Sequence, residues 1–257
     1  MCGTAARRAR VAFVGHRPIG VHAVTAGVAF AAVEIALIRH AEPEWVRDGM
    51  SVDNPPLTVR GHRQARRLAD VLETDTYDHV YVSPLTRARQ TAAPILDAQR
   101  RGEVIEPWLE EIRSPIWQGS PAEKAQRAYQ EEKQRRAAER WAGLEGGESV
   151  RDFVDRIRAG ATNFFAQRGI YRIGDGLPIW HVENPGERIA LIAHAGTNSV
   201  LICVLLGLEP TPWEWERFVL GHASISRLKA LKMGDGWGFS LFSLADDAHI
   251  DPKDRTY

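Results

Sequence analysis

Two histidines of this 257-residue chain follow almost identical apolar runs. His40 comes after Ile35-Ala-Leu-Ile-Arg39, and His194 comes after Ile189-Ala-Leu-Ile-Ala193. Short apolar runs between polar residues are typical of buried strands, and ligands of open α/β sheets bind at the carboxyl ends of the strands. If the two strands are neighbours in a parallel sheet, we expect both imidazoles at one edge of that sheet.

Arginines accompany these histidines. Arg39 directly precedes His40, and Arg87 lies in Ser83-Pro-Leu-Thr-Arg-Ala-Arg-Gln-Thr91, where a helix is expected to begin. A planar guanidinium suits phosphate oxygens, and a neutral imidazole nitrogen can attack phosphorus. An isolated Arg-His pair is also typical of a surface ion pair. Two histidines and two arginines at one sheet edge instead predict a cationic phosphate site.

Helices must alternate with these strands to place the four residues. Thr58 is expected to cap one helix, and Ser83-Pro84 has the pattern of a second helix start. Pro94 should kink or end that second helix, because proline lacks an N–H. Ser149 resembles the start of a capping box, and the apolar residues after it recur at spacings of three and four. The surest predicted helix therefore runs from 150 to 165.

The rest of the chain completes an α/β pattern. Residues 196–206 predict a further helix, and Thr211-Pro212 begins a short one. Gly234-Asp235-Gly236 lies between two strand-like segments and predicts a hairpin. Strands separated by helices predict one α/β domain with a mostly parallel sheet and an antiparallel edge strand.

Composition limits the classes of partner. The chain has 33 Lys+Arg and 33 Asp+Glu, so its formal net charge of +0 provides no general field for nucleic acid or anionic membranes. Its two cysteines, Cys2 and Cys203, lie in unrelated contexts, which excludes a disulfide framework and a zinc cluster. A reducing compartment, and hence a cytoplasmic location, fits this cysteine usage.

The first 32 residues differ from the rest of the chain, because no acidic residue precedes Glu34. Arg7-Arg8 superficially resembles an export signal, but Arg17 and other polar residues interrupt the segment, and its apolar part is shorter than the roughly 20 residues of a membrane span. We expect residues 1–32 to be a disordered extension or a start codon assigned too far upstream. A single domain should then cover 33–257, with a charged helical excursion at about 113–147.

Four ordered blocks identify a family. They are Leu37-Ile-Arg-His-Ala-Glu42, Leu57-Thr-Val-Arg-Gly61, Ser83-Pro-Leu-Thr-Arg-Ala-Arg-Gln-Thr91 and Ala193-His-Ala-Gly196. From about Ile35 to Leu208 the sequence resembles the histidine phosphatase superfamily, which includes the cofactor-dependent phosphoglycerate mutases. The resemblance implies a three-layer α/β/α fold of the phosphoglycerate mutase type.

The resemblance also implies roles for the predicted site. His40 would be the nucleophile that becomes phosphohistidine, while Arg39, Arg87 and His194 would bind the phosphoryl group. We expect a protonated His194 to assist the arginines in stabilising charge on the transition state. No metal and no cofactor is required by this chemistry.

The proton donor of the family is usually a glutamate in a Leu-x-Glu-Ile context. Trp108-Leu-Glu-Glu-Ile112 supplies it, with Glu111 as the better match and Glu110 as the competitor. A carboxylic acid of raised pKa could protonate the leaving alkoxide and later accept a proton from water. Ala41 and Ala195 replace the glycines that usually follow the two histidines, which predicts a slightly tighter pocket.

Departures from the mutase pattern favour hydrolysis. Pro43 and Val46 replace a serine and an asparagine of the mutases, and Glu111-Ile-Arg-Ser-Pro115 stands where they have Glu-Arg-His-Tyr-Gly. Both changes remove polar groups that would hold a phosphorylated three-carbon acid. We therefore expect a metal-independent phosphomonoesterase acting on a small soluble phosphate ester. A mutase-type phosphotransferase and a catalytically silent phosphate-binding scaffold are the alternatives, and the sequence leaves the substrate and a possible homodimer open.

Overall fold

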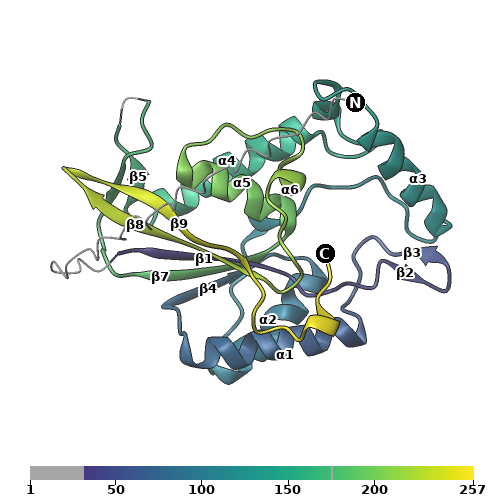
Figure 1. Cartoon of the computed structure of the whole chain (residues 1–257), viewed down its shortest axis with the longest axis horizontal. Helices are drawn as coiled ribbons and strands as arrows, with labels where there is room; N and C mark the ends of the chain where they lie inside the picture. The colour runs from purple at the N-terminus through teal and green to yellow at the C-terminus, as the bar shows by residue number, and fades with distance from the viewer. Residues whose placement is uncertain (1–31, 175) are drawn as a thin grey trace, which may run out of the picture.

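The computed structural model of the chain describes residues 32–174 and 176–257 (Figure 1). The expected extension over 1–32 therefore lies, apart from residue 32, outside the described residues. Strands of one large mixed sheet run through the middle of the molecule, and helices cover its two faces (Figure 1).

The seven strands of this sheet lie in the order β4-β7-β1-β8-β9-β6-β5. Their bounds are β1 Glu34–Arg39, β4 His79–Val82, β5 Ile170–Arg172, β6 Trp180–Val182, β7 Arg188–Ala193, β8 Ile225–Met233 and β9 Gly236–Asp246. Strands β1 and β7 are parallel neighbours, with Ile35 opposite Ile189 and Arg39 opposite Ala193. The two similar runs thus pair in register, which places the residues that follow them side by side.

The α/β class with a mostly parallel sheet is confirmed, and antiparallel pairings extend from β1 to the edge strand β5. Strand β8 pairs antiparallel with β1 in the interior of the sheet, and β9, β6 and β5 continue by antiparallel pairings. Strands β4, β7, β1, β9 and β5 run in one direction, and β8 and β6 run in the other. Chain connectivity explains these antiparallel pairings, because the hairpin β8–β9 needs no crossover helix and can add directly to the free side of β1.

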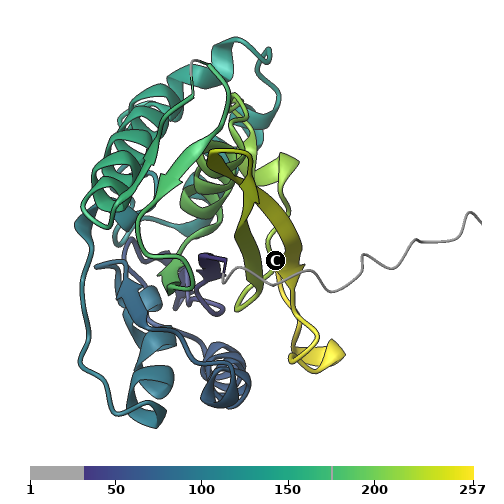
Figure 2. The same cartoon turned by 90° about the vertical axis from the view of Figure 1, so that its left-hand side faces the viewer.

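Two helical layers pack on opposite faces of the strands. Helices α1 (Val59–Thr74) and α2 (Thr86–Ala98) share a core cluster with Ala36 and Ile38 of β1. Helices α4 (Val150–Ala166) and α5 (Ala195–Leu206) share the other cluster with Ile35 and Leu37. In Figure 2 the blue helices α1 and α2 lie below the strands and the teal helix α4 lies above them. Alternate side chains of β1 therefore pack against the two helical layers.

The predicted helix starts are confirmed at Thr58 and Ser149. The Thr58 hydroxyl accepts a hydrogen bond from Gly61 N (2.9 Å), and the Ser149 hydroxyl accepts one from Asp152 N (3.0 Å). The expectation for Ser83-Pro84 is wrong by two residues, because Leu85 is the N-cap of α2 and the Ser83 hydroxyl bonds to His194.

Pro94 does not end α2, which continues to Ala98. Proline removes one backbone hydrogen bond, but Ala92, Ile95 and Leu96 are buried around it. Burial of apolar side chains on both sides of the proline offsets the lost bond, so packing overrides the local preference.

The region 113–147 holds one charged helix and a short turn. Helix α3 covers Ala122–Lys133, and the 3-10 turn η2 covers Glu139–Ala142, so the helical residues of this region form two separate elements. Helix α3 lies next to the small hairpin of β2 (Val46–Arg47) and β3 (Met50–Ser51), to which Ser51 N–Ser120 O (2.8 Å) joins it (Figure 1). The remaining short elements are η1 (Pro107–Leu109), α6 (Glu214–Arg217) and η3 (Pro252–Asp254).

Within residues 32–174 and 176–257, no helix combines the length and the apolar character that crossing a bilayer requires.

Candidate active site

The carboxyl ends of β1 and β7 bring the two predicted histidines together. His40 follows β1 directly, and its amide donates to Ala193 O at the end of β7 (2.9 Å). The ring centroids of His40 and His194 are 5.1 Å apart. This juxtaposition, expected from the two similar runs, is confirmed.

Hydrogen bonds fix the tautomer of His40. Its Nδ1 lies 2.8 Å from the carbonyl oxygen of Ala41, which can only accept, so Nδ1 carries the proton. Its Nε2 then carries the lone pair and accepts from Arg87 Nε (3.2 Å). Burial and the positive charge of Arg87 lower the pKa of His40 well below its usual value. The imidazole is therefore neutral, with a nucleophilic nitrogen facing a guanidinium.

Two arginines lie near this ring, Arg87 buried and Arg39 partly buried. Burial lowers the pKa of Arg39 and of Arg87 to about 10, because neither guanidinium pairs with a carboxylate in the part of the chain that is described. Arg39 Nε and Arg87 Nη1 are buried and have no hydrogen-bond partner among the described residues. The Arg87 guanidinium also lies 4.8 Å from the centroid of the Trp45 ring. Both arginines are thus oriented, with donors left over for an anion.

His194 precedes the first turn of α5. Its Nε2 lies 2.7 Å from the Ser83 hydroxyl, and its buried Nδ1 lacks a partner within the described residues. Burial, followed by the charges of Arg87 and Arg39, lowers the pKa of His194 well below its usual value. The His194 ring is therefore neutral in the molecule without an anion, and a protonated His194 in the phosphoryl-bound state stays a prediction. When Ser83 donates to Nε2, the neutral ring still presents Nδ1–H as a donor.

The segment after η1 separates the two candidate acids. Glu111 accepts hydrogen bonds from Gly196 N (2.9 Å) at the start of α5 and from Ile112 N (3.0 Å). Glu110 instead forms an ion pair with Arg113 (2.8 Å). A Cβ on residue 196 would lie 2.5 Å from Glu111 Oε1, so the close approach of this carboxylate requires glycine there. Of the two carboxylates, that of Glu111 alone accepts a hydrogen bond from the start of α5 within the described residues.

Arg156 of α4 holds the path of this segment. Its guanidinium donates to the carbonyl oxygens of Glu110 (3.0 Å) and Glu111 (3.2 Å) and pairs with Glu148 (2.8 Å). Burial alone would raise the pKa of Glu148, but the hydrogen bonds from Arg156 and Arg113 hold it below its usual value. The Glu111 backbone is thus fixed by a charge-assisted contact that the sequence analysis did not identify.

His222 is a third histidine of the site that sequence reasoning missed. Its ring centroid lies 5.5 Å from that of His40, and its Nε2 lies 2.9 Å from Arg39 Nη2. Burial and the neighbouring Arg39 lower the pKa of His222 to about 3. His222 stands three residues before β8, which is antiparallel to β1, so its entry into the site depends on that pairing.

Together these groups form a compact site for a tetrahedral anion. A neutral imidazole nitrogen is surrounded by two guanidiniums, and unpartnered donors remain on Arg39, Arg87 and His194 within the described residues. The first amides of α5 lie beside it, where a helix N-terminus favours negative charge. This arrangement can bind a phosphoryl group and place its phosphorus before a nucleophile.

Sequence comparison supports the same conclusion. A sequence model of the histidine phosphatase superfamily (branch 1) matches residues 35–237. Phosphoserine phosphatase 1 of Hydrogenobacter thermophilus is 28% identical over 180 residues, which cover 69% of this chain and 78% of that protein. A Yersinia enterocolitica protein named "Probable phosphoglycerate mutase GpmB" is 29% identical over 229 residues, which cover 85% and 95%.

Solved structures share the fold. A mycobacterial glucosyl-3-phosphoglycerate phosphatase has a TM-score of 0.60 at 22% identity, covering 83% of this chain and 99% of that one. The α-ribazole phosphatase of Shigella flexneri has a TM-score of 0.61 at 24% identity, covering 83% and 96%. Because the matched region 35–237 spans most of the sequence and contains both predicted histidines, the chain belongs to the histidine phosphatase superfamily.

Proposed function

We propose that this protein is a metal-independent phosphomonoesterase that hydrolyses a small organic phosphate through a phosphohistidine on His40. The observation that carries the proposal is the state of His40: a buried, neutral ring whose Nε2 lone pair lies beside the Arg87 guanidinium. Membership of the superfamily and relatives named as phosphatases support a hydrolase.

The reaction has two balanced steps. In the first, His40 Nε2 forms a bond to phosphorus while the ester P–O bond breaks, and Glu111 in its acid form gives its proton to the leaving alkoxide. In the second, the Glu111 carboxylate takes a proton from a water that attacks phosphorus, and the P–N bond breaks to release phosphate. Arg39, Arg87 and His194 donate to the equatorial oxygens, where charge is spread in the transition state.

Hydrolysis in the presence of a chelator tests this reaction. We expect the protein to hydrolyse p-nitrophenyl phosphate with excess EDTA present, and His40→Ala to abolish both turnover and labelling by a ³²P-substrate. Activity that depends on added divalent metal would contradict the mechanism. Binding of inorganic phosphate without turnover of any ester would instead favour a silent phosphate-binding scaffold.

A phosphoglycerate mutase is the second candidate, because several relatives carry that name, among them one at 29% identity. Pro43 lies between β1 and β2, and Val46 is the first residue of β2. Neither side chain can hydrogen-bond a second hydroxyl or a carboxylate. With a phosphorylated glycerate we therefore expect free phosphate and no isomer. Interconversion of 2- and 3-phosphoglycerate faster than phosphate release would support the mutase.

The substrate can be identified by a panel of about a hundred phosphate esters read out by phosphate release. Relatives and structural neighbours are named for phosphoserine, glucosyl-3-phosphoglycerate and α-ribazole phosphate, and these three classes belong in the panel. A cytoplasmic location stays a prediction from the cysteine usage.

A further inference from the structure

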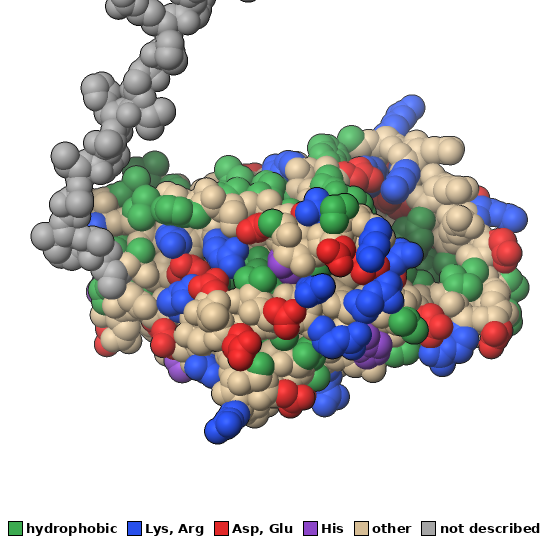
Figure 3. All heavy atoms as spheres, turned by 60° about the horizontal axis from the view of Figure 1, so that its bottom comes forward, with side chains coloured by type: hydrophobic (Ala, Val, Ile, Leu, Met, Phe, Trp, Pro, Cys, Tyr) green, Lys and Arg blue, Asp and Glu red, His purple; other side chains and the backbone are tan. Residues whose placement is uncertain are grey.

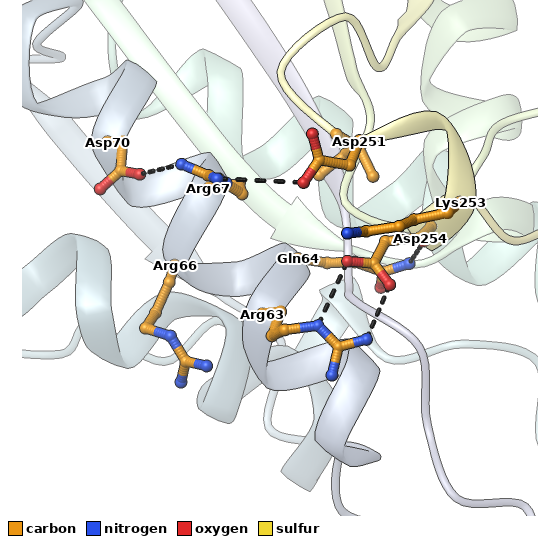
Figure 4. A pocket seen from close by; sticks show the side chains of 9 residues that line it. Arg63, Gln64, Arg66, Arg67, Asp70, Asp251, Lys253 and Asp254 are labelled. Atoms are coloured by element: carbon orange, nitrogen blue, oxygen red, sulfur yellow. Dashed lines mark hydrogen bonds and ion pairs between the residues drawn. The ribbon is translucent and has the colours of Figure 1, made fainter.

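A hollow of about 350 Å³ separates α1 from the C-terminal segment, residues 250–257, on the face shown in Figure 3. Arginines of α1 face aspartates of the segment across it (Figure 4). Arg63 donates to both carboxylate oxygens of Asp254 (3.2 and 2.7 Å), and Arg67 lies 3.9 Å from Asp251. Because these opposite charges pair across the hollow, they attach the C-terminal segment to α1. The hollow is therefore not an anion site.

A chain of hydrogen bonds leads from these ion pairs toward the active site. Gln64 of α1 donates to Asp254 O (2.7 Å) and to the Thr256 hydroxyl (2.9 Å). Thr256 in turn contacts His222 twice, through His222 N–Thr256 O (3.0 Å) and His222 Nδ1–Thr256 Oγ1 (2.9 Å). The segment therefore holds both the backbone and the ring of His222.

The other side of the His222 ring holds Arg39. A guanidinium can only donate, so His222 Nε2 accepts from Arg39 Nη2 (2.9 Å) and Nδ1–H donates to Thr256. Arg39 Nη1 donates to Leu220 O, two residues before His222. These contacts occupy both terminal nitrogens of Arg39 and leave its buried Nε without a partner in the described structure. The orientation of Arg39 is thereby set from the chain terminus.

We propose that His222 and Thr256 are positioning residues, which fix Arg39 for phosphoryl binding through the hydrogen bonds that join them. A guanidinium held in one geometry loses less freedom when an anion binds, so affinity for phosphate is the property they should control. Neither residue takes part in proton transfer to the leaving group. The proposal rests on the proposed function only in assigning the bound anion as a phosphoryl group.

Calorimetric titration with inorganic phosphate tests the proposal without requiring turnover. We expect His222→Leu to raise the dissociation constant of phosphate about tenfold or more, the effect of losing a hydrogen bond to a charged group. Thr256→Val should raise it by a smaller factor, about threefold. Thr74→Val is the matched control, because the Thr74 hydroxyl is exposed and bonds only to Val71 O, and it should change nothing.

Two conservative variants separate the contacts of the ring. His222→Gln places an acceptor near the Nε2 position and should restore most of the phosphate affinity. His222→Asn reaches only the Nδ1 position, keeps the Thr256 contact and should resemble His222→Leu. Equal behaviour of Gln and Asn would contradict a role through Arg39.

Kinetics give an independent readout. His222→Leu should raise KM and the inhibition constant of orthovanadate by the same factor for esters with good and poor leaving groups. Glu111→Gln should instead lower kcat mainly for poor leaving groups. Unchanged phosphate affinity in His222→Leu and Thr256→Val, with wild-type affinity intact, would overturn the positioning role alone. A wild-type protein that binds phosphate but hydrolyses nothing would overturn only the proposed function. If His222→Leu does not fold, Thr256→Val and Arg63→Gln carry the same test from farther away.

Discussion

The two ends of strand β1 treat buried charge in opposite ways. At its amino end, Glu34 is only 6% exposed and is surrounded by Arg188 (2.9 Å) and Lys229 (3.1 Å), while the Tyr77 hydroxyl donates to it (3.0 Å). At its carboxyl end, Arg39 is partly buried beside His40 and pairs with no carboxylate of the described residues. Six residues of one strand thus connect a saturated ion network to an unsaturated cationic site.

The pKa values follow the same division. Burial raises the pKa of Glu34, but hydrogen bonds from Arg188 and Lys229 outweigh it and leave the pKa below its usual value. Burial lowers the pKa of Arg39 and Arg87 to about 10, with no bonded carboxylate to reverse it. The paired charges at the amino end therefore stabilise the fold. The cations without a carboxylate partner at the carboxyl end destabilise it, and a bound anion would remove this destabilisation.

The largest effect should come from the nucleophile. His40→Ala should lower turnover by a factor on the order of 10⁴–10⁶ and abolish ³²P-labelling, while the free energy of unfolding stays close to wild type. Steady-state kinetics and acid-labile labelling measure the first part, and urea unfolding measures the second. Retained labelling in this variant would show that the covalent role belongs elsewhere.

Mild acid should lower the stability of the protein through the histidines at the carboxyl end of β1. The pKa values of His40, His194 and His222 are all lowered in the folded state, so below pH ~6.5 the unfolded chain binds protons that the folded chain does not. These three histidines should therefore lower the free energy of unfolding by about 1.4 kcal/mol per pH unit each, or about 4 kcal/mol together between pH 6 and 5. His249, whose pKa burial also lowers, adds to this slope. Urea titrations at the two pH values measure the slope.

The amino end should titrate in a lower window. The pKa of Glu34 is lowered on folding, so its contribution is present above the unfolded value near 4.3 and is lost only as the pH falls through the folded value. Between pH 6 and 5, the free energy of unfolding of His222→Asn should fall by about 1.4 kcal/mol less than that of the wild type, because one histidine is lost. An unchanged slope would contradict the assignment of this window to the carboxyl end.

A methionine substitution can compare the two ends directly. Arg87→Met should lower kcat/KM by about 10²–10³, because one charge-stabilising group is lost. The same change should raise the free energy of unfolding by about 1 kcal/mol, since a buried cation without a carboxylate partner is replaced by an apolar chain that still packs on Trp45. Kinetics and urea unfolding on the same preparation test both signs. A lower free energy of unfolding in Arg87→Met would contradict the proposed difference between the two ends of β1.

Arg188→Met should give the opposite result. Glu34 and Asp75 would lose a shared partner, although Lys229 and Arg227 remain near them. We expect the free energy of unfolding to fall by about 2–3 kcal/mol, and kcat/KM per folded molecule to stay within about twofold of wild type. A decrease in activity as large as that of Arg87→Met would show that the two ends are coupled.

Much of the site could be predicted before the fold was known. The runs before His40 and His194 predicted two buried strands with a histidine at each carboxyl end, because buried parallel strands are apolar throughout. That the two strands are neighbours came from the structure. The helix after Ser149 followed from its cap and from side chains that recur on one face. These features are local, so the sequence was enough to indicate them.

Glu111 and Glu110 mark the limit of local reasoning. The two acids are adjacent in a segment without a repeating pattern, and each could have faced the site. The structure directs Glu111 to Gly196 N, 85 residues away, and Glu110 to its near neighbour Arg113. The choice depends on Arg156 of α4, whose contact with this segment no local pattern encodes.

What the sequence determined by itself was the set of reactive residue types and the two strand ends that carry Arg39, His40 and His194. What only the tertiary structure decided was how these groups are held: His222 reaches Arg39 across 183 residues, and Thr256 reaches His222 from the chain terminus. The antiparallel pairing of β8 with β1 makes that contact possible. Strand formation follows from the pattern of neighbouring residues, whereas the pairing of polar groups far apart in the chain is set by the packing of the whole sheet and its helices.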